Sequence, residues 1–101
     1  MASFHIEVAG PGRLAASGEL GFATATAALE SGLALIASGP AWTIDLAGVT
    51  AGDSAGLAVL VEWLSAARAG GVRVGYVSVP AQILAVARIS GLEGLLVDQS
   101  G

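Results

Sequence analysis

Asp53 and Ser54 are the main candidates for chemistry in this sequence, because they form its one compact polar cluster in a very apolar chain. They come shortly after the apolar run that ends at Leu46, and directly before a segment with helical periodicity. At a helix start, a carboxylate, a hydroxyl and unpaired backbone N–H groups stand together at one point of the surface. We therefore expect the function of the protein to be located at this junction.

The residue types needed for catalysis or metal binding are largely missing. The chain has no Cys and a single His, His5, which lies in an expected edge strand, so zinc and Cys–His sites are excluded. Ser54 has no neighbouring His or Lys to activate it as a nucleophile. The segment around it lacks the Lys of a phosphate-binding loop, and Asp53 would repel a phosphate. We expect a protein that is not an enzyme and that needs no cofactor or metal ion.

Two interpretations of the cluster remain open. Either Asp53 or Ser54 can be the N-cap of the helix, accepting a hydrogen bond from a free backbone N–H. Alternatively, Ser54 is an exposed hydroxyl that a partner recognises or that is phosphorylated. A phosphate is favoured by the helix dipole but disfavoured by the adjacent carboxylate, so phosphorylation would act as a repulsive switch at an interface.

The hydropathy pattern predicts an α/β fold in which a mixed sheet follows an N-terminal hairpin. Strands are expected over residues 4–8, 13–18, 41–46 and 72–77. A tight turn is expected after Leu46. Helices are expected over 22–36, over about 54–69, and from Pro80 as first helical residue to a break at Gly91. Leu92, Leu95 and Leu96 are expected in a last packed turn or a short strand.

The two longer expected helices carry apolar faces. In the first, the expected core face begins at Phe22. In the second, the expected core face is Leu57, Leu60, Val61 and Leu64, and the opposite stripe is Ala55, Val59, Glu62 and Ala66, with Trp63 on its flank. A stripe exposed to solvent is normally charged. This one is either covered by another helix of the domain or is a docking face, where a partner packs around the tryptophan.

Size and composition predict a single domain of 101 residues, with a core over about 4–96 and a frayed tail over 98–101. With 54% hydrophobic and 12% charged residues, some apolar surface should stay exposed, which often marks a partner surface. The net charge of −4 and the dispersed Arg residues argue against binding to nucleic acids. No uncharged window is long enough to span a bilayer and no signal peptide is visible, so we expect a cytoplasmic protein without direct membrane insertion.

Several of these segments together resemble the STAS domain (sulfate transporter and anti-sigma factor antagonist). They are Ser17-Gly18-Glu19-Leu20, Ile44-Asp45-Leu46 followed by Val49, and Asp53-Ser54-Ala55-Gly56-Leu57. The resemblance covers about residues 4–96 and implies a four- to five-stranded sheet with helices packed against it. Within the family, residues 53–64 and 80–92 are most similar to MlaB-type subunits. That similarity implies a cytosolic accessory subunit, peripheral to the inner membrane. It would bind the ATPase of the Mla phospholipid ABC transporter, support assembly and activity, and so serve lipid transport between the bacterial membranes and outer-membrane lipid asymmetry.

The alternative within the same family is an anti-sigma factor antagonist, whose Ser54 would be phosphorylated by a partner kinase. The sequence departs from those antagonists at Ala55, where they often carry a second Ser or Thr, and this departure favours the transporter interpretation. It also has Gly21 where a family Asp is common. The residues predicted to bind the partner are Asp53, Ser54, Ala55, Gly56, Val59, Glu62 and Trp63.

Overall fold

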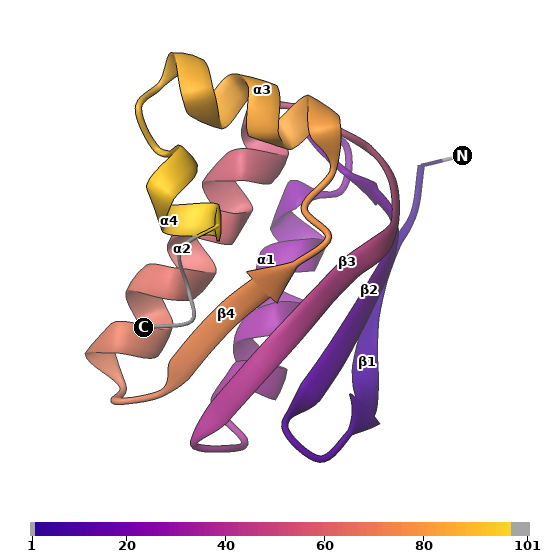
Figure 1. Cartoon of the computed structure of the whole chain (residues 1–101). Helices are drawn as coiled ribbons and strands as arrows, with labels where there is room; N and C mark the ends of the chain where they lie inside the picture. The colour runs from indigo at the N-terminus through magenta and orange to yellow at the C-terminus, as the bar shows by residue number, and fades with distance from the viewer. Residues whose placement is uncertain (1, 98–101) are drawn as a thin grey trace.

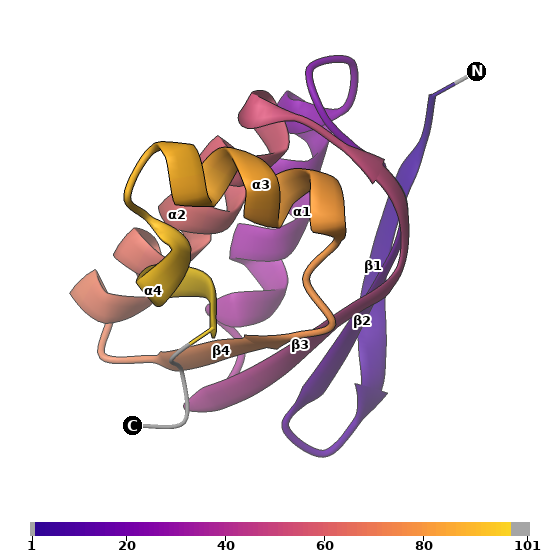
Figure 2. The same cartoon turned by 45° about the horizontal axis from the view of Figure 1, so that its top comes forward.

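A four-stranded sheet with its helices on one face is the framework of the protein, as seen in the computed structural model, which describes residues 2–97 (Figures 1 and 2). The elements in chain order are β1 (Phe4–Gly10), β2 (Arg13–Leu20), α1 (Ala25–Ile36), β3 (Ala41–Gly52), α2 (Ser54–Ala69), β4 (Arg73–Val77), α3 (Ala81–Ile89) and α4 (Glu93–Val97). Their alternation confirms the predicted α/β class.

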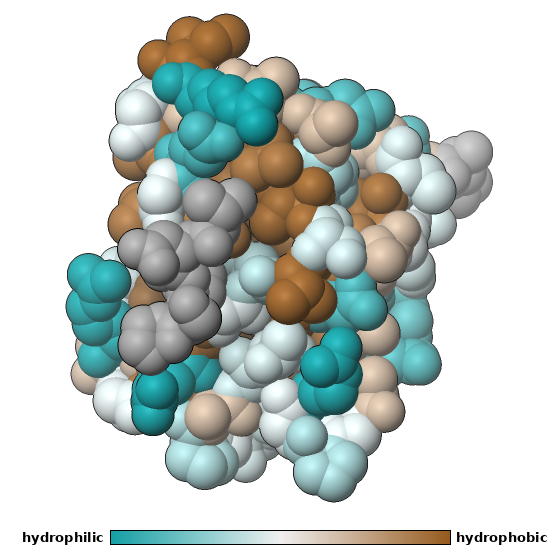
Figure 3. All heavy atoms as spheres, viewed as in Figure 1, coloured by the Kyte–Doolittle hydropathy of each residue, from teal (hydrophilic) through white to brown (hydrophobic). Residues whose placement is uncertain are grey.

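The sheet has the order β1-β2-β3-β4 and is mixed, as predicted. β1 and β2 form an antiparallel hairpin, while β2 pairs with β3 and β3 with β4 in parallel. The face toward the helices carries the buried aliphatic side chains, among them Leu14, Ile44 and Leu46. The view of Figure 3 shows hydrophilic, pale and hydrophobic residues side by side on the surface in front of the sheet.

β3 is longer than predicted, because the expected tight turn after Leu46 is absent. The strand continues to Gly52, which lies opposite Leu20 of β2. Two register shifts in the β2–β3 pairing accommodate the glycine-containing segment, and Val49 points into the core at 7% exposure. Local sequence suggested a turn here, but backbone pairing with a distant strand holds the segment extended.

α1 begins at Ala25, later than predicted, and Phe22 lies outside the helix with 88% of its side chain exposed. The buried Thr24 side chain closes the preceding loop. Its hydroxyl donates to the carbonyl of Glu19 at 2.8 Å and accepts the N–H of Gly21 at 3.1 Å. The expectation that Phe22 begins a core face is therefore wrong.

Trp63 of α2 is the centre of the helix packing and is completely buried. Its indole N–H donates to the carbonyl of Leu29 in α1 at 3.3 Å, and its ring lies 6.1 Å from that of Phe4. The ring occupies the space beside Gly32, where any Cβ would overlap it. Val59, on the same side of α2, is also buried at 4% exposure. Trp63 is thus covered by α1, which favours, for this part of the stripe, the alternative that another helix of the domain covers it.

The C-terminal part differs in detail from the prediction. Pro80 lies just before α3 as its N-cap, where it was expected as the first helical residue. The segment after Gly91 forms the short helix α4 and not a strand, and Leu96 is fully buried. The frayed tail predicted for residues 98–101 lies outside the described residues. Within residues 2–97, no helix is both long and apolar enough to cross a membrane.

Candidate partner-binding surface

Asp53 caps the first turn of α2. It follows Gly52, the last residue of β3, and has extended backbone angles. Its Oδ1 atom accepts the backbone N–H of Ala55 at 2.9 Å and that of Gly56 at 3.2 Å. These N–H groups would otherwise lack a partner, as at any helix start. The N-cap is therefore Asp53, which resolves the first of the alternatives left open by the sequence.

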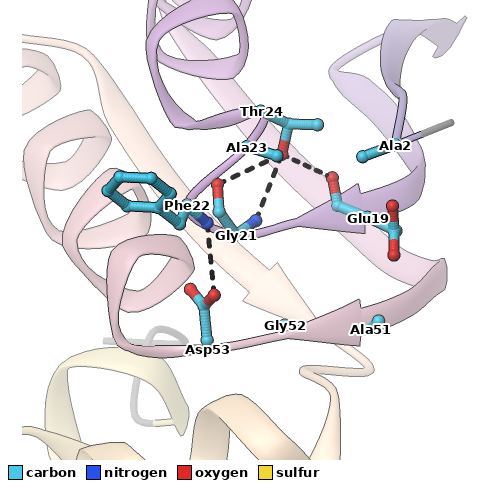
Figure 4. Close-up of a pocket in the computed structure, with 9 residues that line it drawn as sticks. All are labelled: Ala2, Glu19, Gly21, Phe22, Ala23, Thr24, Ala51, Gly52 and Asp53. Carbon is cyan, nitrogen blue, oxygen red and sulfur yellow. Dashed lines mark hydrogen bonds between the residues drawn. The ribbon is translucent and has the colours of Figure 1, made fainter.

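The same carboxylate also holds the loop before α1. Oδ2 of Asp53 accepts the backbone N–H of Phe22 at 3.2 Å (Figure 4). The loop can approach this closely because residue 21 is glycine: a Cβ there would lie 2.8 Å from Oδ2. These N–H donors, that of Phe22 most of all, lower the pKa of Asp53 below its ordinary value of 3.8, against a smaller opposing effect of desolvation. One side chain thus joins the two segments that begin α1 and α2.

Replacing Asp53 with alanine is expected to lower the free energy of unfolding by about 1–2 kcal/mol at neutral pH, because α2 loses its cap. Folding lowers the pKa of this carboxyl group, so the folded chain binds fewer protons than the unfolded chain as pH falls. The stabilisation from its charge is therefore complete well above 3.8 and is lost as the pH falls through the folded-state value. Urea unfolding of the wild type, Asp53→Ala and Asp53→Asn across this range measures both effects.

Asp53→Asn is the matched control, since asparagine caps helices about as well but does not titrate. It should lose less stability than Asp53→Ala at neutral pH. A difference between wild type and Asp53→Asn that stays constant in acid would show that the charge of Asp53 has no part in stability.

Ser54 is the first residue of α2 and its side chain is exposed. Among the described residues, none forms a hydrogen bond with its hydroxyl. Ala58 and Glu62 follow at one-turn intervals along the same side of the helix, and both are exposed. This side of α2 faces away from α1 and from the sheet. Ser54 is therefore available at one end of an open helix face.

A shallow groove of about 350 Å³ runs between this helix face and α3. We call it the α2–α3 groove, and its lining residues are Ser54, Leu57, Ala58, Val61, Glu62, Val86, Ser90 and Leu92. Its floor is apolar, while Ser54, Glu62 and Ser90 provide polar groups. Beside it, Ile89 at the end of α3 is 89% exposed, and hydrophobic surface is visible at that end of the helix (Figure 3).

A second hollow, of about 320 Å³, lies on the other side of the start of α2 (Figure 4). It is formed by the loop before α1 and by the end of β3, and its lining residues are Ala2, Glu19, Gly21, Phe22, Ala23, Thr24, Ala51, Gly52 and Asp53. Thr24 and Asp53 already use their side chains in hydrogen bonds that hold the loop. The start of α2 is thus a ridge between two hollows, with the exposed Phe22 next to it.

The structure brings together only part of the predicted partner-binding set. Asp53, Ser54 and Glu62 are exposed, and Ala55 is half-buried. The other three residues, Gly56, Val59 and Trp63, are buried. The difference is one of rotation about the helix axis: the side of α2 that carries Gly56, Val59 and Trp63 is buried, and the next side is open.

Sequence reasoning missed the residues that line the α2–α3 groove beyond Ser54 and Glu62. Val61 was expected in the core, and Ala58, Val86 and Ser90 were not considered as surface. A signal was present in the spacing of Ser54, Ala58 and Glu62, which places a serine, an alanine and a glutamate on one side of the helix. This spacing alone could not predict a groove, because the other side of the groove is formed by α3, which is distant in the sequence.

Two solved structures are similar to this chain in fold. The unphosphorylated anti-sigma factor antagonist SpoIIAA is 18% identical, with a TM-score of 0.70, and the match covers 94% of this chain and 86% of that chain. A proposed anti-sigma factor antagonist from Thermotoga maritima is 17% identical, with a TM-score of 0.73 and coverage of 93% and 83%. These likenesses establish a STAS-like fold.

The family follows from the sequence match. A family model described as "Mlab, STAS domain" matches residues 7–98, so the chain belongs to this family of STAS domains. The resemblance inferred from the sequence is thereby confirmed. No curated protein matches the chain.

Proposed function

We propose that the protein is a non-catalytic accessory subunit of an Mla-type phospholipid ABC transporter, and that it binds the ATPase subunit. The observation that carries the proposal is the family match over residues 7–98, in a chain whose Ser54 lies exposed at the rim of the α2–α3 groove. The subunit would be cytoplasmic and held at the inner membrane through the complex. There it would support assembly and activity of a transporter that maintains outer-membrane lipid asymmetry.

The α2–α3 groove has the character of a docking surface. An apolar centre with a polar rim is the usual arrangement of a protein–protein interface. Ala58 in the middle of the helix face is small, so a partner can approach the backbone of α2 closely. The exposed Glu62 and Asp53, in a chain of net charge −4, favour a partner with basic groups around an apolar contact.

The surroundings of Ser54 support binding over catalysis. The hydroxyl has no hydrogen bond to a base within the described residues, and the carboxylate of the preceding residue, Asp53, accepts three backbone N–H groups. In residues 2–97, no cluster of His, Asp and Glu could hold a metal ion. Recognition by a partner is the role that remains for this surface.

Ala58→Arg, in the middle of the helix face, is expected to weaken binding to the purified ATPase subunit roughly tenfold to a hundredfold, as for a residue central to an interface. Ser54→Glu, at the rim, is expected to weaken it less. Both sites are exposed, and arginine is nearly as favourable as alanine within a helix, so the fold should be preserved. At the first helical residue an acid is tolerated because of the helix dipole. Isothermal titration calorimetry with the ATPase subunit measures the loss.

Ala69→Arg is the matched control, because Ala69 is an exposed alanine at the far end of α2, outside the lining of the groove. This variant should bind as tightly as the wild type. Circular dichroism of all three variants establishes that they are folded. Failure of the wild-type chain to bind the ATPase subunit would contradict the proposed function, and equal weakening by Ala69→Arg would place the interface elsewhere.

A second candidate function is a phosphorylation-controlled antagonist, favoured by the exposed position of Ser54 at the start of α2. A phosphate there would lie next to the Asp53 carboxylate, and the added charge would repel an acidic partner. Incubation of the chain with ATP and host lysate, followed by mass spectrometry of Ser54, tests this function. A phosphate at Ser54 that is absent from Ser54→Ala would support it, and an unmodified Ser54 under all growth conditions would reject it.

A further inference from the structure

We propose that two copies of the chain pair through β1, forming a continuous sheet across a two-fold axis centred on Ile6. β1 is the first strand in the order β1-β2-β3-β4, so within the described residues only its β2 side is paired. An open strand edge presents unpaired N–H and C=O groups to a second strand. Val8 on this edge is 52% exposed, an apolar side chain that pairing would cover.

The backbone of β1 determines which groups point outward. The N–H of Glu19 donates to the carbonyl of Ser3 at 2.8 Å, one step before the pairing of Phe4 with Gly18. Residues that bond to the partner strand alternate in an antiparallel ladder. His5 and Glu7 therefore direct their backbone groups toward β2.

The intervening residues Phe4, Ile6 and Val8 direct theirs toward the open edge. If two copies of β1 meet antiparallel with Ile6 opposite Ile6, Phe4 of each lies opposite Val8 of the other. All three outward-directed residues then find a counterpart, and each such pair can exchange two hydrogen bonds. A shift of the register in either direction leaves one of them without a partner, so the backbone favours this register.

The side chains select the same register. With Ile6 at the centre, His5 of one copy lies opposite Glu7 of the other, in the type of pair whose side chains are closest. Within one chain these two side chains already meet, with His5 Nε2 at 2.7 Å from Glu7 Oε1. Shifting the register by two residues would place His5 opposite His5 or Glu7 opposite Glu7. His5 of one copy therefore meets Glu7 of the other only in the register that the backbone favours.

The helix layer leaves room for this arrangement. The two-fold axis is perpendicular to the sheet, so both copies carry their helices on the same face and the two α1 helices become neighbours. α1 directs Leu29 and Gly32 toward α2. Its opposite flank carries Ala27, Ser31 and Ala34, which are exposed and small enough for a second helix to approach.

The other sheet edge lacks this property. β4 contains one charged residue, Arg73, and no acidic partner for it, so two copies of β4 have no complementary pair. β1 also lies at the far side of the molecule from α3 (Figures 1 and 2). Pairing through β1 would therefore leave the α2–α3 groove accessible, and the two proposals can fail independently.

Sedimentation equilibrium of the purified full chain tests the pairing, with the wild type expected as a dimer. His5→Glu places two glutamates opposite each other on both sides of the axis and should weaken the dimer about tenfold to thirtyfold. His5→Lys places a positive charge opposite Glu7 and should remain dimeric. The exchange His5→Glu with Glu7→Lys should restore the dimer, because glutamate then lies opposite lysine.

A backbone variant tests the register independently of charge. Val8→Pro removes an outward-directed N–H while leaving the hydrogen bonds to β2 in place, so the chain should be folded by circular dichroism and monomeric. Val8→Thr keeps the N–H and should be dimeric. A wild-type chain that stays monomeric at millimolar concentration would overturn the proposal, and so would a dimer that neither His5→Glu nor Val8→Pro weakens.

Discussion

Trp63→Ala is expected to lower the free energy of unfolding by about 3–5 kcal/mol, the range for truncating a large buried aromatic residue. The side chain is completely buried, fills the space beside Gly32, and lies against the ring of Phe4. Its removal leaves a cavity between α1, α2 and β1. Since domains of this size are stable by only about 5–15 kcal/mol, much of the population should be unfolded in mild denaturant. Urea unfolding followed by far-UV circular dichroism measures the change.

Trp63→Phe is the matched control. It keeps a ring in the same space but loses the hydrogen bond to the carbonyl of Leu29, so about 1–3 kcal/mol should be lost, partly for the unpaired acceptor. If Trp63→Ala kept full stability and lost only partner binding, Trp63 would be the docking anchor that the sequence suggested, and the packing described above would be contradicted.

Gly56→Ala is expected to destabilise the protein by about 1–3 kcal/mol, as for overpacking in a close-packed region. Residue 56 is buried in the first turn of α2, and a Cβ there would overlap the carbonyl oxygen of Leu20 at the end of β2. Alanine is intrinsically better than glycine in a helix by about 1 kcal/mol, so a net loss would show that the clash dominates. Thermal unfolding of the variant gives the sign directly.

The same substitution should also affect the proposed interface. Relief of the clash requires the start of α2 to move away from β2, and Ser54 and the Asp53 cap would move with it. We therefore expect weaker binding to the ATPase subunit than in the wild type. Gly94→Ala in α4 is the control, because a Cβ at residue 94 meets no atom within 4 Å, so it should leave both stability and binding unimpaired. A Gly56→Ala variant as stable as the wild type would contradict the close approach of α2 to β2.

Local sequence was sufficient for the class of fold and for the position of the candidate site. Alternating hydrophobicity predicts the first strands and helical periodicity predicts a helix over 54–69, because each spacing places the apolar side chains on one face of that element. The Asp53-Ser54 pair marks a helix start because its polar side chains can satisfy free N–H groups, and Asp53 does so. The motif around it was also specific enough to indicate the STAS family.

Other features were decided only by the tertiary structure. Periodicity shows that a helix face is apolar, but it does not show which neighbour covers that face. α1 covers Trp63, and Val59 on the same side is also buried, so the open surface lies one face further round, at Ser54, Ala58 and Glu62. Likewise, pairing with β2 extends β3 to Gly52, through a segment that reads locally as a turn.

The sequence by itself therefore determined the order of elements, the capped start of α2 and the family of the protein. The first two depend on interactions between residues close together in the chain, and the family is indicated by motifs of neighbouring residues. The tertiary structure alone decided which side of α2 is available to a partner and which strand is left at the edge of the sheet. Both depend on contacts between segments that are distant in sequence: Gly32 with Trp63, Gly21 with Asp53, and β2 with β3. No local pattern encodes these contacts, which is why Trp63, predicted to bind a partner, belongs to the core.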